Sequence, residues 1–184
     1  SMSVLIESIS IVVKLETIAE KYTGGMDQYI KDYSHLGLCM DEDIVRVGFM
    51  TSEDAEEFVL NLESFGFAFV TDGHFDEIAL VDQLEGFAMP CGWLVFFNIV
   101  LFEGDIRVKV CSREGKPLNE DKVSFPRGWN YETSLSRRTC VFNPKDVESH
   151  MKFLRHKDGV DFYLYKLTGE ERWVRRNVKR NLNS

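Results

Sequence analysis

Two short segments carry the side chains whose chemistry could define a site. The first is the turn MPCGW at residues 89–93, where Cys91 lies in a Pro/Gly turn next to Trp93. A thiol in such a turn can act as a nucleophile if a base lies nearby, and His74 is the nearest histidine in the sequence. A lone cysteine is a weak signal, however, and a turn anchored by a buried tryptophan explains the same residues.

The second segment, PRGWNYE at residues 126–132, combines aromatic and basic side chains, and two further arginines follow it. Trp, Tyr and Arg are enriched at interaction hot spots, and the same side chains can stack on nucleic-acid bases. A loop fixed to the core by Trp129 is the structural alternative. We predict a candidate binding surface from both segments. Its residues are Arg127, Trp129, Tyr131, Arg137, Arg138, Cys91 and Trp93.

The rest of the sequence offers no recognisable catalytic or ligand-binding motif. The four cysteines are scattered, and none pairs with another Cys or a His at zinc-ligand spacing. Gly24 and Gly25 lack the neighbouring residues of a phosphate-binding loop. The many carboxylates, among them Asp72 and Asp82, form no spacing typical of paired acid–base catalysis. We therefore predict neither a metal nor a cofactor, and we assign no catalytic residue.

The charge is distributed unevenly along the chain. Residues 1–100 contain 4 Lys/Arg and 18 Asp/Glu, which gives −14, and residues 101–184 contain 18 Lys/Arg and 12 Asp/Glu, which gives +6. Opposite charges of this kind favour contact between the two parts, within one chain or across a homodimer, or contact with a protein partner. Nucleic acid is a less suitable ligand, because the whole chain carries −8 and domains that bind nucleic acid are usually basic overall.

The length and hydrophobicity of the chain indicate one folded domain. It has 184 residues, of which 44% are hydrophobic, enough to bury a substantial core. The apolar run at residues 4–13 is far shorter than the roughly 20 residues that a membrane-spanning helix needs. We therefore expect no membrane association and a cytoplasmic location.

The first part of the chain follows a β-α-β-β-α-β pattern. The predicted strands cover residues 5–13, 36–40, 44–49 and 67–71, and the predicted helices cover residues 15–22, 26–33 and 52–65. This order is that of a ferredoxin-like unit, an antiparallel sheet with helices on one face, over residues 4–71.

The helix that follows residue 51 is the clearest element of this unit. Thr51 and Asp54 fit a capping box at its start, and Gly66 can end it in the left-handed conformation. Phe58 and Leu62 fall on its apolar face, so we predict that they are buried against the sheet.

The second part, residues 77–184, is richer in strands. The predicted strands cover residues 78–81, 93–102, 106–110, 140–142 and 160–167, with a long irregular loop at residues 112–136. The apolar run at residues 93–102 is typical of a strand covered on both faces. Two helices are predicted, one from Asn143 to Gly159 and a basic one at residues 170–182. The whole chain, residues 1–184, is thus predicted as a single α+β domain with a mixed, largely antiparallel sheet flanked by helices.

Three segments of the chain carry a resemblance to a known group of proteins. They are VLIESISIVV at residues 4–13, MPCGWL at residues 89–94 and PRGWNYETSL at residues 126–135. Together they resemble a family of small bacterial proteins of unassigned function. The resemblance implies a bacterial, cytosolic protein, and it brings no catalytic residue and no substrate.

These observations favour a non-catalytic cytosolic module that binds a protein partner, with an immunity protein as one version. Two alternatives remain open. One is an enzyme for a small substrate, with a cleft near Cys91 or near the acidic residues 72–82. The other is a nucleic-acid-binding protein that uses its basic C-terminal half.

Overall fold

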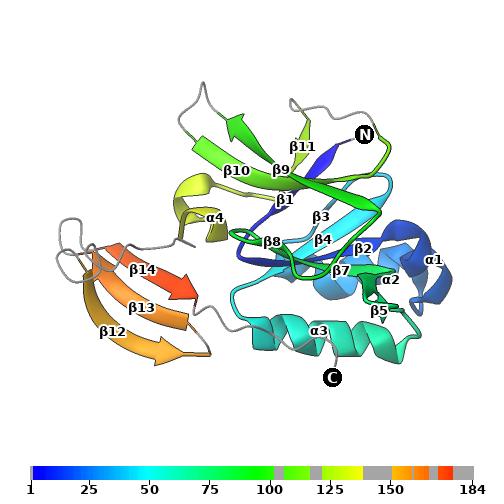
Figure 1. Cartoon of the computed structure of the whole chain (residues 1–184), viewed down its shortest axis with the longest axis horizontal. Helices are drawn as coiled ribbons and strands as arrows, with labels where there is room; N and C mark the ends of the chain where they lie inside the picture. The colour runs from blue at the N-terminus through cyan, green and yellow to red at the C-terminus, as the bar shows by residue number, and fades with distance from the viewer. Residues whose placement is uncertain are drawn as a thin grey trace.

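A five-stranded sheet lies at the centre of the protein, with a four-stranded sheet on one side and three helices on the other (Figure 1). The computed structural model describes residues 2–101, 106–116, 122–138, 151–158, 160–165 and 170–175. A third sheet, of three strands, is formed by the last described residues. The protein is therefore α+β with largely antiparallel sheets, as the sequence predicted.

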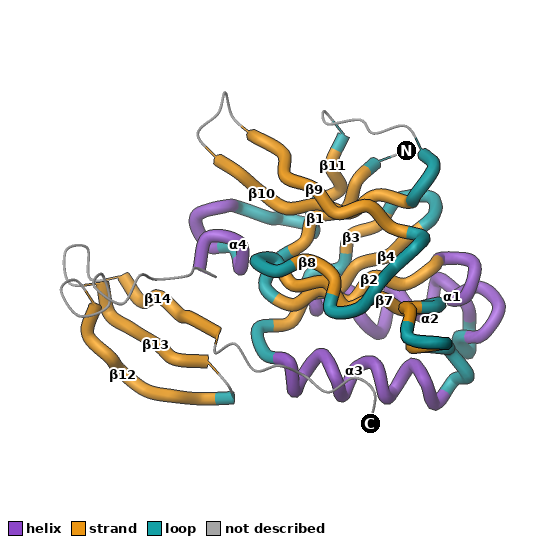
Figure 2. Tube along the Cα trace, in the orientation of Figure 1, coloured by secondary structure: helices purple, strands orange, loops and turns teal. Residues whose placement is uncertain are grey.

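The order of the elements along the chain can be followed in Figure 2. The helices are α1 (Leu15–Lys21), α2 (Gly25–Tyr33), η1 (Ser34–Leu36), α3 (Ser52–Ser64), η3 (Tyr131–Thr133) and α4 (Leu135–Arg138). The strands are β1 (Ser3–Ile6), β2 (Ile9–Lys14), β3 (Cys39–Met40), β4 (Ile44–Phe49), β5 (Val70–Thr71), β6 (His74–Phe75), β7 (Ile78–Asp82), β8 (Gly86–Phe87), β9 (Leu94–Leu101), β10 (Ile106–Arg113), β11 (Val123–Ser124), β12 (Met151–Lys157), β13 (Val160–Tyr165) and β14 (Glu170–Arg175).

The central sheet has the strand order of a ferredoxin-like unit. Its order is β3-β4-β2-β7-β8, and every neighbouring pair is antiparallel. The crossover through α1 and α2 joins β2 to β3, and the crossover through α3 joins β4 to β7, so each crossover skips one strand. This interleaving is the split βαβ arrangement that the sequence predicted.

Helix α3 forms where its capping signals predict. The Oγ1 of Thr51 accepts a hydrogen bond from the N–H of Asp54 at 3.2 Å, which satisfies a donor that the helix leaves free. Gly66 adopts a φ of 92°, the left-handed conformation that ends the helix. Phe58 and Leu62 are buried in the core between α3 and the sheet, as predicted.

The first predicted strand, residues 5–13, is divided between two sheets. Ser8 has a φ of 48°, and this left-handed residue turns the chain between β1 and β2. As a result, β1 pairs with β10 and β11, whereas β2 lies at the centre of the five-stranded sheet. Both strands are buried, so their sequences are apolar and form one continuous run. The run therefore gives no sign of the turn between β1 and β2.

The fourth strand of the ferredoxin-like unit is β7, not the predicted strand at residues 67–71. Residues Val70–Thr71 instead form a small hairpin with His74–Phe75, and the turn between them is Asp72-Gly73. Both turn residues have positive φ, which suits a two-residue hairpin. The unit therefore ends at Asp82 rather than at Thr71.

Strands β9 and β10 form the predicted hairpin, with eight residue pairs in continuous register. The prediction that residues 93–102 are covered on both faces is wrong. Leu94 and Ile99 are buried, but 54% of Val100 is exposed. The apolar run forms β9, which lies at the edge of its sheet.

Two helices predicted near the C-terminus are wrong in the residues that the structure describes. Met151–Lys157 is strand β12, which pairs antiparallel with β13, so no helix runs through these residues; Gly159 lies outside the described residues. Glu170–Arg175 is strand β14, paired with β13, and no helix begins there. The remaining parts of both predicted helices, residues 143–150 and 176–182, lie outside the described residues, as does the predicted strand at residues 140–142.

Candidate functional site

The solvent side of α3 accumulates negative charge. Its residues Ser52–Ser64 contain five carboxylates and no Lys or Arg. The first turn accounts for Glu53 and Asp54, since the positive end of the helix dipole favours acids there. It does not account for Glu57 or Glu63. Like charges three or four residues apart cost a helix about 0.2–0.5 kcal/mol each, so this face lowers the stability of α3.

Four of these five carboxylates have no cationic partner in the part of the chain that the structure describes. Among the described residues, no cation lies within ion-pair distance of Glu53, Asp54, Glu57 or Glu63. The exposed Leu60, of which 66% is accessible, lies on the same side of the helix. The solvent face of α3 therefore presents acids around an apolar residue.

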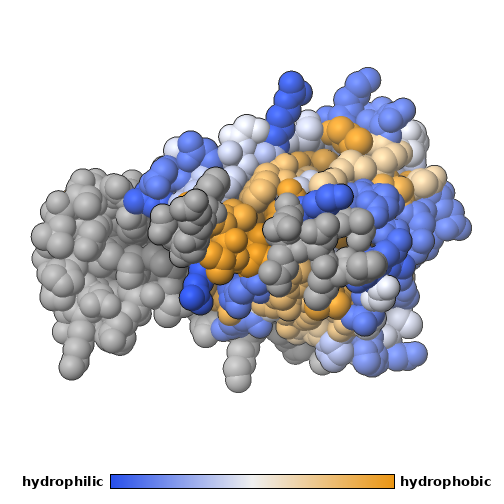
Figure 3. Space-filling model, turned by 90° about the horizontal axis from the view of Figure 1, so that it is seen from above, coloured by the Kyte–Doolittle hydropathy of each residue, from blue (hydrophilic) through white to orange (hydrophobic). Residues whose placement is uncertain are grey.

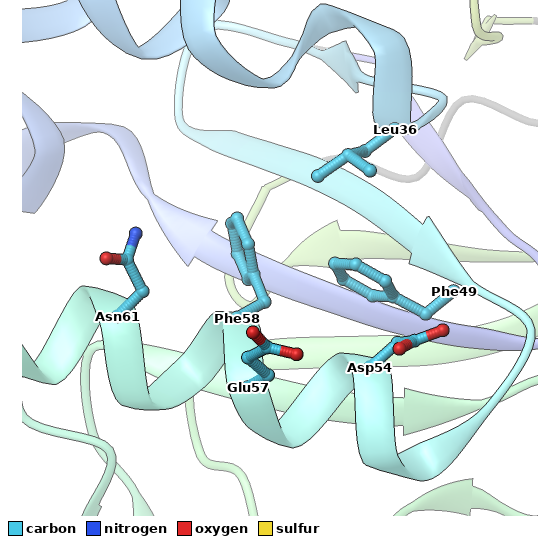
Figure 4. A pocket seen from close by; sticks show the side chains of 6 residues that line it. All are labelled: Leu36, Phe49, Asp54, Glu57, Phe58 and Asn61. Carbon is cyan, nitrogen blue, oxygen red and sulfur yellow. The ribbon is translucent and has the colours of Figure 1, made fainter. Parts of the chain in front are cut away.

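A groove of about 390 Å³ opens beside these acids (Figure 4). Leu36 from η1, Phe49 from the end of β4 and Phe58 from α3 form its apolar floor, and the rings of Phe49 and Phe58 lie 5.3 Å apart. The side chains that border the groove on α3 are Asp54, Glu57 and Asn61. The two carboxylates stand beside the aromatic floor in Figure 4. The groove thus combines an apolar base with a negative border.

A cluster of aromatic side chains holds the floor in position. The ring of Tyr33 packs edge-on against Phe58 at 4.9 Å. Its hydroxyl accepts a hydrogen bond from Asn61 Nδ2 at 2.7 Å and shares a second one with the Tyr22 hydroxyl at 2.9 Å. Burial, followed by the hydrogen bond that it donates to Asp32, raises the pKa of Tyr22, so this hydroxyl stays protonated and donates. The groove is therefore backed by a fixed network and not by a loose surface.

Cys91 and Trp93, which the sequence singled out, lie elsewhere. Trp93 donates its Nε1 hydrogen to the carbonyl of Phe75 at 3.1 Å, and its ring lies beneath Lys14 Nζ at 4.9 Å and Arg113 Cζ at 5.6 Å. Burial raises the pKa of the Cys91 thiol. A neutral thiol is a poor nucleophile, so the arrangement fits an anchored turn better than a catalytic site.

The aromatic and basic loop is largely occupied by its own contacts. Trp129 stacks on Phe125 at 4.6 Å, and Tyr131 lies edge-on to it at 6.3 Å. The guanidinium of Arg137 pairs with Glu132 at 3.3 Å. Trp129 is thus partly buried against the core, as the structural alternative expected.

Arg127 and Arg138 are the two remaining arginines of the predicted binding surface. Arg127 is exposed at the tip of the loop. Arg138 ends α4, and its side chain lies outside the described residues. Trp93 places the Cys91 turn against β2, β6 and β10, whereas the Trp129 loop contacts its own neighbours. Among the described residues, these contacts do not join the predicted surface into one site.

A buried polar network joins the two larger sheets where the chain turns between β1 and β2. Arg46, of which 1% is exposed, donates to Ser10 Oγ at 3.0 Å and to the carbonyl of Gly37 at 2.9 Å, and it lies 3.7 Å from Glu7 Oε1. The other oxygen of Glu7 accepts hydrogen bonds from the N–H and the hydroxyl of Ser136, both at 2.8 Å. These charges are matched by partners, which identifies the network as structural.

One group of acids has the proximity of a metal site. The carboxylates of Asp41, Glu42 and Asp43 offer oxygens within 4.8 Å of one another. Asp41 Oδ1, however, accepts the N–H groups of Asp43 and Ile44 at 2.7 and 2.9 Å, and Lys116 Nζ lies 3.1 Å from Asp43. The turn geometry and the lysine account for these residues, and they carry no metal assignment.

The sequence could have identified part of the groove but not all of it. Asp54, Glu57 and Asn61 follow one another at i, i+3 and i+7, so they share one stripe of α3. Leu36 and Phe49 come from two other elements, and only the fold brings them to that stripe.

Comparison of the chain with protein-family models, with curated proteins and with solved structures gives no match. The resemblance to a family of small bacterial proteins therefore remains a prediction. Within the described residues, no helix is both long and apolar enough to cross a membrane.

Proposed function

We propose that the protein is a non-catalytic interaction module that binds a cationic polypeptide in the groove of α3. The observation that supports this is the negative border, Asp54 and Glu57, which has no cation within ion-pair distance among the described residues and lies beside an apolar floor. A partner with Arg or Lys flanking an apolar side chain would satisfy both parts at once. The apolar contact would supply affinity, and the charges would supply orientation and speed of association.

A polypeptide fits this surface better than a small molecule does. The negative border continues beyond the groove along the exposed side of α3, through Glu53 and Glu63. An extended or helical segment can contact several of these acids together. An immunity protein that neutralises a basic toxin would be one member of this class.

The enzyme alternative has less support. A catalytic Cys91 would need a lowered pKa or an adjacent base, whereas burial raises the pKa of this thiol.

A second candidate function, nucleic-acid binding, rests on β12. This strand exposes Lys152, Phe153, Arg155 and Lys157, a combination of basic and aromatic side chains that suits a phosphate backbone with bases. The negative surface of α3 would have to lie away from such a ligand. A fluorescent single-stranded oligonucleotide that binds the protein, and binds less well after Lys152→Ala with Arg155→Ala, would support this candidate.

A peptide titration tests the proposal for the groove. The probe is a synthetic peptide of alternating arginine and leucine, with a glutamine–leucine peptide of equal length as its control. We expect calorimetry to show tighter binding of the arginine peptide than of the glutamine peptide. The variant Asp54→Asn with Glu57→Gln should weaken binding by roughly five- to thirtyfold, since two exposed ion pairs contribute about 0.5–1 kcal/mol each.

Glu85→Gln is the control, because Glu85 is an exposed acid between β7 and β8 that lies neither on α3 nor in the groove. Binding that falls equally in both variants would indicate attraction to net charge alone. Binding that is as tight in the double variant as in the wild type would contradict the proposal.

A further inference from the structure

Most sheet edges in the described part of the protein are protected against pairing with another strand. The edge strands β3, β8 and β11 have two residues each. In the third sheet, β12 carries Lys152, Arg155 and Lys157 and a break in register, and four of the six residues of β14 are charged. Short length, charge and bulges are the usual means by which proteins prevent edge-to-edge association.

Strand β9 has none of these features. Its sequence, LVFFNIVL, contains no charge and no proline, and its eight residues exceed the typical strand length of about 5–6. It pairs with β10 along its whole length without a bulge. In the described residues, no strand pairs with its other side.

The side chains of β9 add to this exposed edge. Asn98 and Val100 are exposed, and Phe96, Phe97 and Leu101 are partly exposed. Seen from above, hydrophobic atoms form a band across the surface over the β9–β10 hairpin (Figure 3). A long, regular, hydrophobic edge of this kind is a template for another strand.

We infer that β9 pairs with β9 of a second copy of this chain, antiparallel and about a two-fold axis. The two four-stranded sheets then become one continuous sheet. Such an axis, normal to the sheet, sets residues of the same face opposite each other. A register with Phe97 at the axis places Val95 opposite Ile99 of the second copy, so the new pairs are apolar. This surface is separate from the groove of α3 and does not depend on its function.

The uncharged, apolar sequence of β9 favours a second copy as the occupant, because it is complementary to itself in this register, and the charges of the neighbouring strand do not oppose it. The charges on β10 are Arg107, Lys109 and Arg113. Neighbouring strands lie about 4.8 Å apart, so the two copies of β10 would be separated by about 14 Å, or three strand spacings. This exceeds the Debye length of roughly 8 Å at physiological salt. Identical chains can therefore meet at β9 without strong repulsion.

Light scattering and analytical ultracentrifugation over a concentration series test the inference. The key variant is Asn98→Glu with Val100→Glu. Within one chain these glutamates would face Lys109 and Arg107, a favourable cross-strand pairing, but between two copies they would repel each other. Leu60→Gln is the control, because it removes an exposed apolar side chain from α3 instead.

We expect the wild type and Leu60→Gln to be dimers at micromolar concentration, and the double variant to be a monomer that keeps the circular-dichroism spectrum of the wild type. A monomeric wild type at every concentration, or a double variant that remains dimeric, would overturn the inference. Hydrogen exchange of the wild type gives a second readout that needs no variant. The amides of β9 should exchange faster on dilution while those of α3 do not, and exchange of β9 that is independent of concentration would also overturn it.

Discussion

The charges around Arg46 and those on α3 differ in how the protein compensates them. Arg46 and Glu7 are buried, and each has hydrogen-bond partners on other elements. A Cβ at position 48 would overlap the Arg46 guanidinium, so even the backbone leaves room for this side chain. Asp54 and Glu57 are exposed and have no cationic partner among the described residues. The buried pair maintains the architecture, whereas the acids of α3 have no such structural role among the described residues, which is why we propose that they bind a partner.

The largest effect should come from breaking the buried network. Arg46→Met should lower the free energy of unfolding by about 3–5 kcal/mol, because it leaves the Glu7 carboxylate buried without its cation. Urea denaturation measures this loss. Adding Glu7→Gln to Arg46→Met should recover part of it, since the unpaired charge is then removed. A single variant as stable as the wild type would show that the network is not structural.

The Glu77 carboxylate is intermediate between the buried Arg46 network and the exposed acids of α3. Its contribution to the stability of the fold should depend on pH. Burial alone would raise its pKa, but the hydrogen bond from Lys21 at 2.8 Å and those from Ala68 and Thr17 outweigh it and lower the pKa below its ordinary value of 4.5. A carboxyl with a lowered pKa stabilises the fold above that value, and the stabilisation is lost as the pH falls through the range below 4.5.

Glu77→Gln should therefore destabilise the protein at neutral pH and reduce the further loss on acidification. Denaturation midpoints on both sides of pH 4.5 check this. The prediction is wrong if the wild type and the variant lose equal stability in acid.

The smallest effect on stability should come from the groove. Glu57→Gln relieves like-charge contacts on α3, so we expect stability to change by no more than about 0.5 kcal/mol, towards a more stable protein. The same urea measurement applies. A cost of several times this size would mean that Glu57 is part of the architecture, and the contrast with Arg46 would then disappear.

The sequence predicted the central fold because its local signals agree with the final structure. Thr51 and Gly66 bound α3, and the two crossovers give the ferredoxin-like strand order. One turn was misread in the first part of the chain. Asp72-Gly73 is a two-residue hairpin turn, and an Asp-Gly pair is a strong signal for such a turn. Overlooking it misplaced the fourth strand, and interpreting residues 143–159 as a capped helix hid the strand pairing of β12 with β13.

The candidate site was harder to predict from the sequence than the fold. The aromatic and basic residues of the Trp129 loop attract attention in the sequence, but the structure uses several of them for internal stacking and ion pairs. The groove needs Leu36, Phe49 and Phe58 to meet, and their separation along the chain leaves no local signal. The sequence shows that α3 contains no Lys or Arg. Only the structure shows that Asp54 and Glu57 have no cation within ion-pair distance among the described residues.

The position of the bound peptide tests the central claim most directly. Amide chemical shifts of the isotope-labelled protein, recorded by NMR during titration with the arginine–leucine peptide, show which surface it contacts. Our account predicts that the changes concentrate at Leu36, Phe49, Asp54, Glu57 and Asn61. Changes centred instead on the Cys91 turn, on the Trp129 loop or on β12, or no changes at all, would contradict it.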